Sequence, residues 1–173
     1  MMRGRIGGLA TEMLFVLSAV GCLKEWVFPF FIWQWFPSAD TASQMLEWVF
    51  IVVGVMTLFI YIALGSSAKN SYGLTTVSSL GVYLAIHLPL LLVAPTGGNP
   101  SAALWWQKLS VSWWGLIGEG VELFVPARWM FHPYTIFLLA GGLFLLGRWV
   151  RVVDEENREE AKHFRMPRGQ GDS

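Results

Sequence analysis

The chain of 173 residues has a single cysteine, Cys22, and very few charged residues. One cysteine excludes an intrachain disulfide and any metal site built from several cysteines. Charged residues make up 14% of the chain and hydrophobic residues 54%, whereas soluble domains have about 25% charged residues. The composition therefore predicts a membrane protein rather than a soluble domain.

The sequence also lacks the motifs of common catalytic sites. It has no glycine-rich phosphate loop and no HExxH, CxxC or GxSxG motif, and its three histidines are widely separated. The net charge is zero and the basic residues are scattered, so there is no continuous basic stripe of the kind that binds nucleic acid. The sequence gives no reason to expect an enzyme, and it excludes nucleic acid as a partner.

Long apolar segments are what the chain does have. Each of the four approaches the roughly 20 residues that cross a bilayer as a helix; they are residues 9–31, 45–65, 74–95 and 134–153. They predict an all-α, polytopic membrane protein with a four-transmembrane-helix bundle over residues 1–153 and a charged tail over 154–173. The first segment follows Arg3 and Arg5 like a signal peptide, but Glu12 interrupts it and argues against cleavage.

The basic residues predict the orientation in the membrane. In a four-helix arrangement nine of them lie on the side of the two termini, and only Lys24, Lys108 and Arg128 lie on the other side. Basic residues accumulate on the cytoplasmic side, so both termini are expected in the cytoplasm and the chain in the plasma (inner) membrane. The tryptophans divide the opposite way, because all except Trp149 fall on the outer side.

Residues 102–131 contribute most of this outer, Trp-rich side. Glu119 and Glu122 share a face if a helix continues to them, and Pro126 breaks it ahead of Arg128. The segment is predicted to be either an outer loop with solvated carboxylates or a lid over the mouth of the bundle. An amphipathic helix is indicated by apolar residues at helical spacing, namely Ala102, Trp106, Leu109, Trp113, Leu116 and Ile117.

Ionisable residues inside the predicted spans mark a candidate site, because a charge in hydrocarbon is costly and usually functional. They are Glu12, Glu25, Glu47 and His87. Small and polar residues at helical spacing predict the inward-facing sides of the first three helices. These sides consist of Thr11, Ser18, Cys22 and Glu25 in the first, Glu47, Gly54 and Tyr61 in the second, and Thr76, Ser79, Tyr83 and His87 in the third.

We expect Glu25, Glu47 and His87 to meet in the outer half of the bundle. A buried carboxylate there needs a cation or a hydrogen-bond donor, and the candidates are Lys24, Arg128, Tyr61, Tyr83 and a protonated His87. Glu12 lies near the inner end, within reach of Lys69 or Arg148. The candidate ligand-binding residues are therefore Lys24, Glu25, Glu47, Tyr83, His87, Glu119, Glu122 and Arg128.

Haem is a further possibility for the histidines. His87 lies inside a predicted span and His132 at the outer edge of the last one, whereas two axial ligands need matched depth on facing helices. A lone buried histidine explains His87 equally well.

Two short patterns resemble the DoxX-like family of small four-helix membrane proteins. They are Gly21-Cys22-Leu23-Lys24 at the end of the first span, and Glu47 opening a second span that continues Val53-Gly54-Val55-Met56-Thr57-Leu58. The similarity covers about residues 9 to 95. It implies an association with quinone-linked sulfur oxidation and oxidative-stress complexes, with Lys24 and Glu47 as the carried-over positions; the long segment 96 to 131 departs from the family pattern.

The functional expectation is a small DoxX-like component, redox-linked or non-catalytic, that binds an apolar ligand such as a quinone or a lipid. One alternative is an accessory subunit of a larger energy-transducing membrane complex, docked through residues 102–131 and the C-terminal tail. A haem-b anchor using His87 and His132 is the third.

Overall fold

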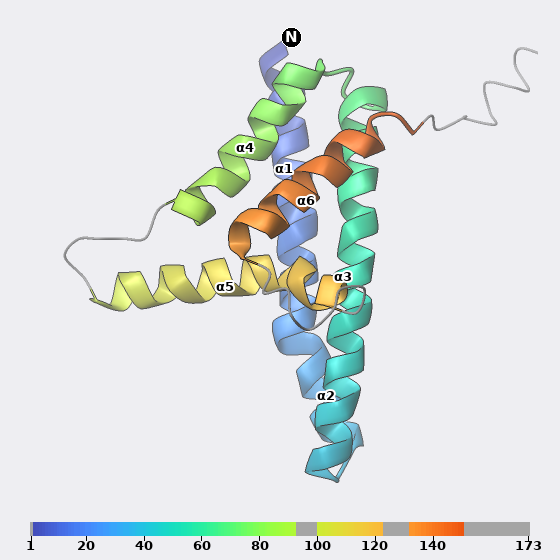
Figure 1. Ribbon diagram of the computed structural model, residues 1–173, viewed down its shortest axis with the longest axis vertical. Helices are drawn as coiled ribbons and strands as arrows, with labels where there is room; N and C mark the ends of the chain where they lie inside the picture. The colour runs from blue at the N-terminus through green and yellow to red at the C-terminus, as the bar shows by residue number, and fades with distance from the viewer. Residues whose placement is uncertain (1, 93–99, 123–131, 151–173) are drawn as a thin grey trace, which may run out of the picture.

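The computed structural model describes residues 2–92, 100–122 and 132–150, and all of its regular elements are helices. The predicted all-α class is confirmed. The elements are α1 (Met2–Cys22), the π-helix η1 (Leu23–Val27), α2 (Phe28–Trp35), α3 (Ala39–Asn70), α4 (Thr76–Leu92), α5 (Pro100–Glu122) and α6 (Pro133–Gly147). In Figure 1, α1, η1 and α2 form one continuous long helix, which lies beside α3 and makes a hairpin with it. Helices α4 and α6 lie toward one end of this hairpin, and α5 crosses it near the middle.

The lengths of the helices differ from those of the predicted spans. Two described helical stretches, Gly4–Trp35 and Ala39–Asn70, are long and apolar enough to cross a membrane. The core helix of a soluble protein and a signal sequence pass the same test. α4 has 17 residues and α6 has 15, so both are shorter than the roughly 20 residues of a typical span. The four-span bundle therefore stays a prediction.

The π-helix η1 keeps the first long helix continuous across a proline. Pro29 has no N–H, and its ring would collide with the carbonyl group of Glu25 in an ordinary α-helix. The helical turn here is one residue longer than an α-helical turn, so the Phe28 N–H donates to the carbonyl oxygen of Leu23, five residues earlier. This turn contains two adjacent charged residues, Lys24 and Glu25. Such π-helical turns occur frequently at functional sites.

The buried face of α1 is not the one that the sequence predicted. Thr11, Ser18, Cys22 and Glu25 are all exposed. The buried side chains of α1 include Leu9, Met13 and Leu17, which are larger and apolar, and the next buried side chain along the helix is that of Lys24 in η1. The prediction was wrong because it followed small and polar residues at seven-residue spacing, whereas the core selects the stripe with most apolar surface.

The predicted inward faces of the second and third spans are largely confirmed. Gly54 and Tyr61 of α3 are buried, as are Ser79, Tyr83 and His87 of α4. Thr76 and Glu47 are exposed, which corrects the expectation that Glu47 points into the bundle. Both exposed residues lie toward the ends of these two helices.

α3 and α6 touch backbone to backbone through two glycines. A Cβ atom added to Gly65 would lie 1.9 Å from the carbonyl oxygen of Phe144, and one added to Gly147 would lie 1.9 Å from that of Ile62. Of the adjacent glycines in α6, Gly141 lies against the ring of Tyr83, and Gly142 has nothing within 4 Å of its added Cβ. Close approach of helices through small residues is typical of membrane bundles.

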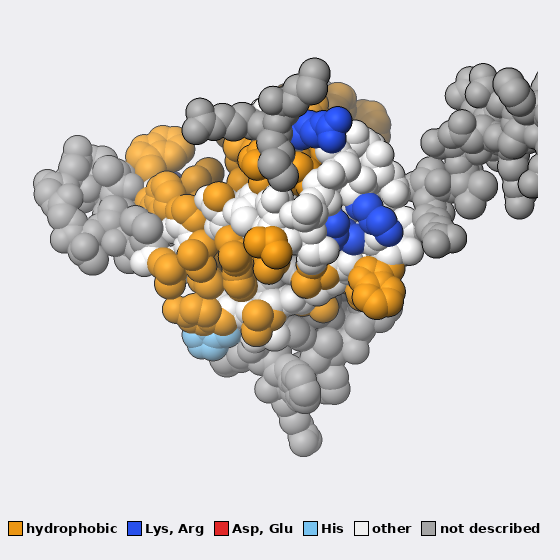
Figure 2. All heavy atoms as spheres, turned by 90° about the horizontal axis from the view of Figure 1, so that it is seen from above, with side chains coloured by type: hydrophobic (Ala, Val, Ile, Leu, Met, Phe, Trp, Pro, Cys, Tyr) orange, Lys and Arg blue, Asp and Glu red, His pale blue; other side chains and the backbone are white. Residues whose placement is uncertain are grey.

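Polar contacts tie the helices together at the end nearest the N-terminus. Glu12 accepts hydrogen bonds from Ser67 Oγ at 3.1 and 3.2 Å, and its hydrogen bond with the Tyr72 hydroxyl raises the pKa of Tyr72. The buried Arg148 donates to Ser79 Oγ and, at 2.9 Å, to the carbonyl oxygen of Leu74. Glu12 is thus held by hydroxyl groups, and the predicted pairing with Lys69 or Arg148 is not formed. Figure 2 views this end and shows basic side chains but no acidic ones among the atoms coloured there.

Candidate ligand groove between η1 and α5

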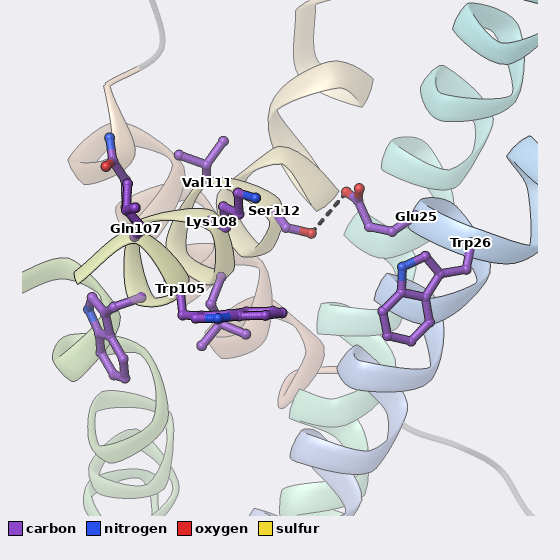
Figure 3. Close-up of a pocket in the computed structure, with 10 residues that line it drawn as sticks. Glu25, Trp26, Trp105, Gln107, Lys108, Val111 and Ser112 are labelled. Atoms are coloured by element: carbon purple, nitrogen blue, oxygen red, sulfur yellow. Dashed lines mark hydrogen bonds between the residues drawn. The ribbon is translucent and has the colours of Figure 1, made fainter. Parts of the chain in front are cut away.

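Two charged residues of η1 hold α5 across the hairpin. Lys24 is only 3% exposed; its Nζ donates to the carbonyl oxygen of Gly115 at 3.0 Å and lies 5.2 Å from the centre of the Phe50 ring. Glu25 Oε1 accepts a hydrogen bond of 2.9 Å from Ser112 Oγ, which Figure 3 shows as a dashed line. Because a buried charge needs compensating partners, these contacts fix where α5 crosses the hairpin.

A groove of about 950 Å³ lies between η1 and α5. Most of its lining is apolar: Trp26, Leu104, Trp105, Trp106, Leu109 and Val111. The polar groups are Glu25, Gln107, Lys108 and Ser112, and Figure 3 shows the rings of Trp26 and Trp105 on the same side of α5. An apolar groove with a few polar groups is the usual form of a site for a small molecule.

A smaller cavity of about 200 Å³ adjoins this groove. The two share Glu25, Trp26, Leu109 and Ser112. The small cavity is otherwise lined by Leu17, Ser18, Gly21, Cys22, Trp113 and Leu116. An elongated ligand in the groove could therefore place one end against the core of the bundle.

Three buried indole N–H groups of α5 have no acceptor in the part of the chain that the structure describes. They belong to Trp106, which lines the groove, to Trp113, which lines the small cavity, and to Trp114. Buried tryptophan N–H groups normally find a hydrogen-bond acceptor. Each of these nitrogen atoms has almost no exposed surface, so the tryptophans offer the groove and the small cavity their apolar rings rather than their N–H groups.

The predicted amphipathic helix over the outer segment forms in part, as α5. Leu116 and Ile117 of its predicted apolar stripe are buried, whereas Leu109 is exposed. The buried Trp114 was not in the predicted stripe. The side chains of the candidate residues Glu119 and Glu122, and the whole of Arg128, lie outside what the structure describes.

The candidate residues Tyr83 and His87 belong to a separate network in the core. Tyr61 Oη and His87 Nε2 are 2.6 Å apart, and His87 Nδ1 is 2.9 Å from the carbonyl oxygen of Tyr83. Since a carbonyl can only accept, Nδ1 carries the proton and Nε2 accepts from the Tyr61 hydroxyl. The Tyr83 ring stacks on His87 at 4.3 Å, and its hydroxyl donates to the carbonyl oxygen of Phe137 at 2.6 Å.

This network does not favour the haem alternative. Both ring nitrogens of His87 are occupied, and His132 is exposed at the start of α6. An axial ligand would need a free ring nitrogen at matched depth on a facing helix. Within the described ranges, no group of three or more His, Cys, Asp or Glu residues could hold a metal ion.

The predicted meeting of Glu25, Glu47 and His87 does not occur. Glu25 is exposed at the groove, His87 is buried in the core, and Glu47 is exposed on α3 with no ion pair to any described residue. Lys24 and Glu25 instead both bind α5, through Gly115 and Ser112, which lie one turn apart on that helix.

Sequence reasoning missed part of the groove lining, above all Trp105, Gln107 and Ser112. These residues lie outside the predicted apolar stripe of α5, so the helical pattern did not select them. Pro29, four residues after Glu25, was the signal that could have indicated an irregular turn at the two charges.

Searches against protein-family models, curated proteins and solved structures find no match to this chain.

The hydrogen bond between Tyr61 and His87 gives an expected stability effect. His87→Phe should lower the free energy of unfolding by about 1–3 kcal/mol, because the buried Tyr61 hydroxyl loses its acceptor. Tyr61→Phe/His87→Phe should recover part of this loss, since no polar group is then left unpaired. Melting of the unchanged protein, the two single variants Tyr61→Phe and His87→Phe, and the double variant in one detergent measures the coupling. Strictly additive losses would contradict the bond between the two side chains.

Proposed function

We propose that this chain is a small, multi-pass plasma-membrane protein that binds a lipid-like ligand, a quinone or a lipid, in the groove between η1 and α5. The observation that carries the proposal is the apolar, tryptophan-lined groove with a few polar groups at its wall, Glu25, Gln107, Lys108 and Ser112. A quinone or lipid supplies both an apolar body and oxygen acceptors. No catalytic role is proposed for the lining residues.

Helix lengths support a placement of this fold in the bilayer. Arg5 and Lys24 of the first long helix are 19 residues apart, as are Phe50 and Lys69 of α3. At about 1.5 Å per residue, each interval spans about 28 Å, close to the roughly 30 Å of hydrocarbon in a bilayer. We place the bilayer between these levels, with α5 at the outer interface and both termini in the cytoplasm.

α4 and α6 complete the proposed four-helix bundle. Arg148, at the end of α6, bonds to Leu74 just before α4 at the inner end. At the other end, His87 of α4 and Phe137 of α6 contact Trp114 of α5. Both helices therefore run between the inner end and the level of α5, and their short length implies a locally thin bilayer.

The resemblance to the DoxX-like family is consistent with a quinone ligand. Its two carried-over positions, Lys24 and Glu47, have different surroundings in this fold. Lys24 is the residue that holds α5 over the groove. Glu47 is exposed on α3 and does not line the groove. We therefore propose Lys24 as a positioning residue of the ligand site, with Glu25 and Ser112 at its polar rim.

Trp105→Ala is expected to reduce the ligand that copurifies with the protein by about tenfold, because its ring lines the groove and about 1.4 kcal/mol of lost contact corresponds to that factor. Protein purified in polymer nanodiscs would be extracted with organic solvent, and quinones and lipids quantified per mole of protein by mass spectrometry. The loss should be confined to one compound class above the bulk lipid background.

Trp149→Ala is the matched control. Trp149 is 85% exposed near the end of α6 and does not line the groove. It should keep the ligand content of the unchanged protein. Equal ligand content in the two variants, or no compound enriched over bulk lipid in the unchanged protein, would contradict the proposed site.

A role as an accessory subunit of a larger membrane complex is the second candidate. The observation in its favour is the exposed apolar surface on the first half of α5, formed by Leu104, Trp105, Leu109 and Val111. A stable set of copurifying subunits would favour this role, whereas a protein that purifies alone with its ligand would favour the first.

A further inference from the structure

The end of the long hairpin is rich in exposed aromatic side chains. We call residues 26–48 the hairpin tip; it comprises the last two residues of η1, α2, the turn to α3 and the first third of α3. Figure 1 shows the tip extending well beyond α5, on the side away from the N-terminus. Its large exposed side chains include Trp26 (72% exposed), Phe30 (64%), Trp33 (52%), Trp35 (70%) and Trp48 (62%).

The tip reaches beyond the bilayer in the placement proposed above, on which this inference rests. Trp35 is 11 residues past Lys24, the residue that marks the level of α5. At about 1.5 Å per residue, the tip extends about 16 Å past that level, whereas the polar layer of one leaflet is only about 5–8 Å thick. Lipid therefore does not cover the rings near the end of the tip, such as Trp33 and Trp35, whereas Trp26 and Trp48 lie at the level of the lipid headgroups. An apolar patch in water typically marks a binding surface.

The charges of the tip are all of one sign. The sequence has no Lys, Arg or His between Lys24 and Lys69, and the tip carries Asp40 and Glu47. Both carboxylates are exposed, and neither has an ion pair or side-chain hydrogen bond to any residue that the structure describes. A surface that carries both exposed aromatic faces and exposed carboxylates is complementary to arginine and lysine side chains, through cation–π contacts and ion pairs.

The same charges disfavour the other occupants. Anionic lipid headgroups would be repelled by Asp40 and Glu47, and the tip of a second copy would bring like charges together. Tryptophan and arginine are also the residues that contribute most to binding at protein interfaces.

We propose that the hairpin tip is a docking surface for a protein on the outer side of the membrane that presents an arginine- or lysine-rich face. Trp33 and Trp35 are its aromatic anchors, and Asp40 and Glu47 select the basic partner.

Photo-crosslinking in intact cells of the native host tests this surface. p-Benzoylphenylalanine replaces Trp33, or in a second variant Trp35, and the control variant carries it at Val77, which is 81% exposed at the opposite end of the bundle. The expected result is an adduct with the same heterologous protein at both tip positions. No adduct with that partner should form at position 77. Adding D40N and E47Q should reduce the adduct about tenfold at unchanged protein level, because both ion pairs are lost while shape is kept.

Each other outcome overturns the docking proposal. These are an adduct only with a second copy, an adduct only with lipid, a yield that neutral Asn and Gln leave unchanged, and no adduct at either position. Labelling of a Ser38→Cys variant by an impermeant thiol reagent, with Cys22 replaced by serine, separates two reasons for failure. A labelled tip without a charge-dependent adduct leaves the proposed membrane placement and ligand groove intact, whereas an unlabelled tip removes the placement as well.

Discussion

Gly65→Ala is expected to destabilise the fold by about 3 kcal/mol or more, which is at the upper end of the cost of overpacking. Its new Cβ would lie 1.9 Å from the Phe144 carbonyl oxygen and 2.8 Å from the carbonyl carbon. Backbone atoms cannot rotate away as a flexible side chain can, so α3 and α6 must separate. Loss of the monodisperse folded species, or a strongly lowered melting temperature in detergent, is the expected readout.

Gly142→Ala is the matched control for this effect. Gly142 belongs to α6, the helix that packs against Gly65 of α3, but it is exposed and has nothing within 4 Å of an added Cβ. Alanine also favours a helix over glycine by about 0.5–1 kcal/mol, so this variant should be as stable as the unchanged protein or slightly more stable. Similar melting of the two alanine variants would show that α3 and α6 do not touch backbone to backbone.

Reversing the charge of Lys24 is expected to have an effect of similar size. In Lys24→Glu, a buried carboxylate would face the Gly115 carbonyl oxygen and the Phe50 ring in place of a cation. Both contacts become repulsive, and an uncompensated buried charge costs roughly 3–5 kcal/mol. We expect α5 to detach from the hairpin, with a lower melting temperature and loss of the copurified ligand.

Lys108→Glu is the control for the change of charge. Lys108 also contributes to the groove but is exposed on α5, so its reversal should change stability by no more than about 0.5 kcal/mol. If Lys24→Glu and Lys108→Glu melt alike, Lys24 does not fix the position of α5.

The helical class and much of the core were predictable because apolar length and periodicity are local properties of the sequence. Tyr61, Ser79, Tyr83 and His87 follow the helical period and are buried. On α1, the same reasoning chose small and polar residues, and the core instead buried Leu9 and Met13. Periodicity says which residues share a face, but which face turns inward depends on the neighbouring helices.

The candidate site was less predictable for a different reason. Lys24 and Glu25 were singled out as charges in an apolar helix, but their partners, Gly115 and Ser112, are about 90 residues away on α5. Nothing in the local pattern indicates that α5 crosses at this level. The expected partner Glu47 was chosen for its charge, and it lies instead on the exposed face of α3.

Thiol labelling tests the proposed membrane placement most directly. In a Cys22→Ser background, single cysteines would replace Gln107 on α5 and Ser71 just after α3, both of which are exposed. The cysteine at 107 should react with an impermeant maleimide in intact cells, and the cysteine at 71 only after the cells are permeabilised. Labelling at 71 but not at 107 in intact cells would invert the placement, and labelling at both would show that the two levels do not lie on opposite sides of a bilayer.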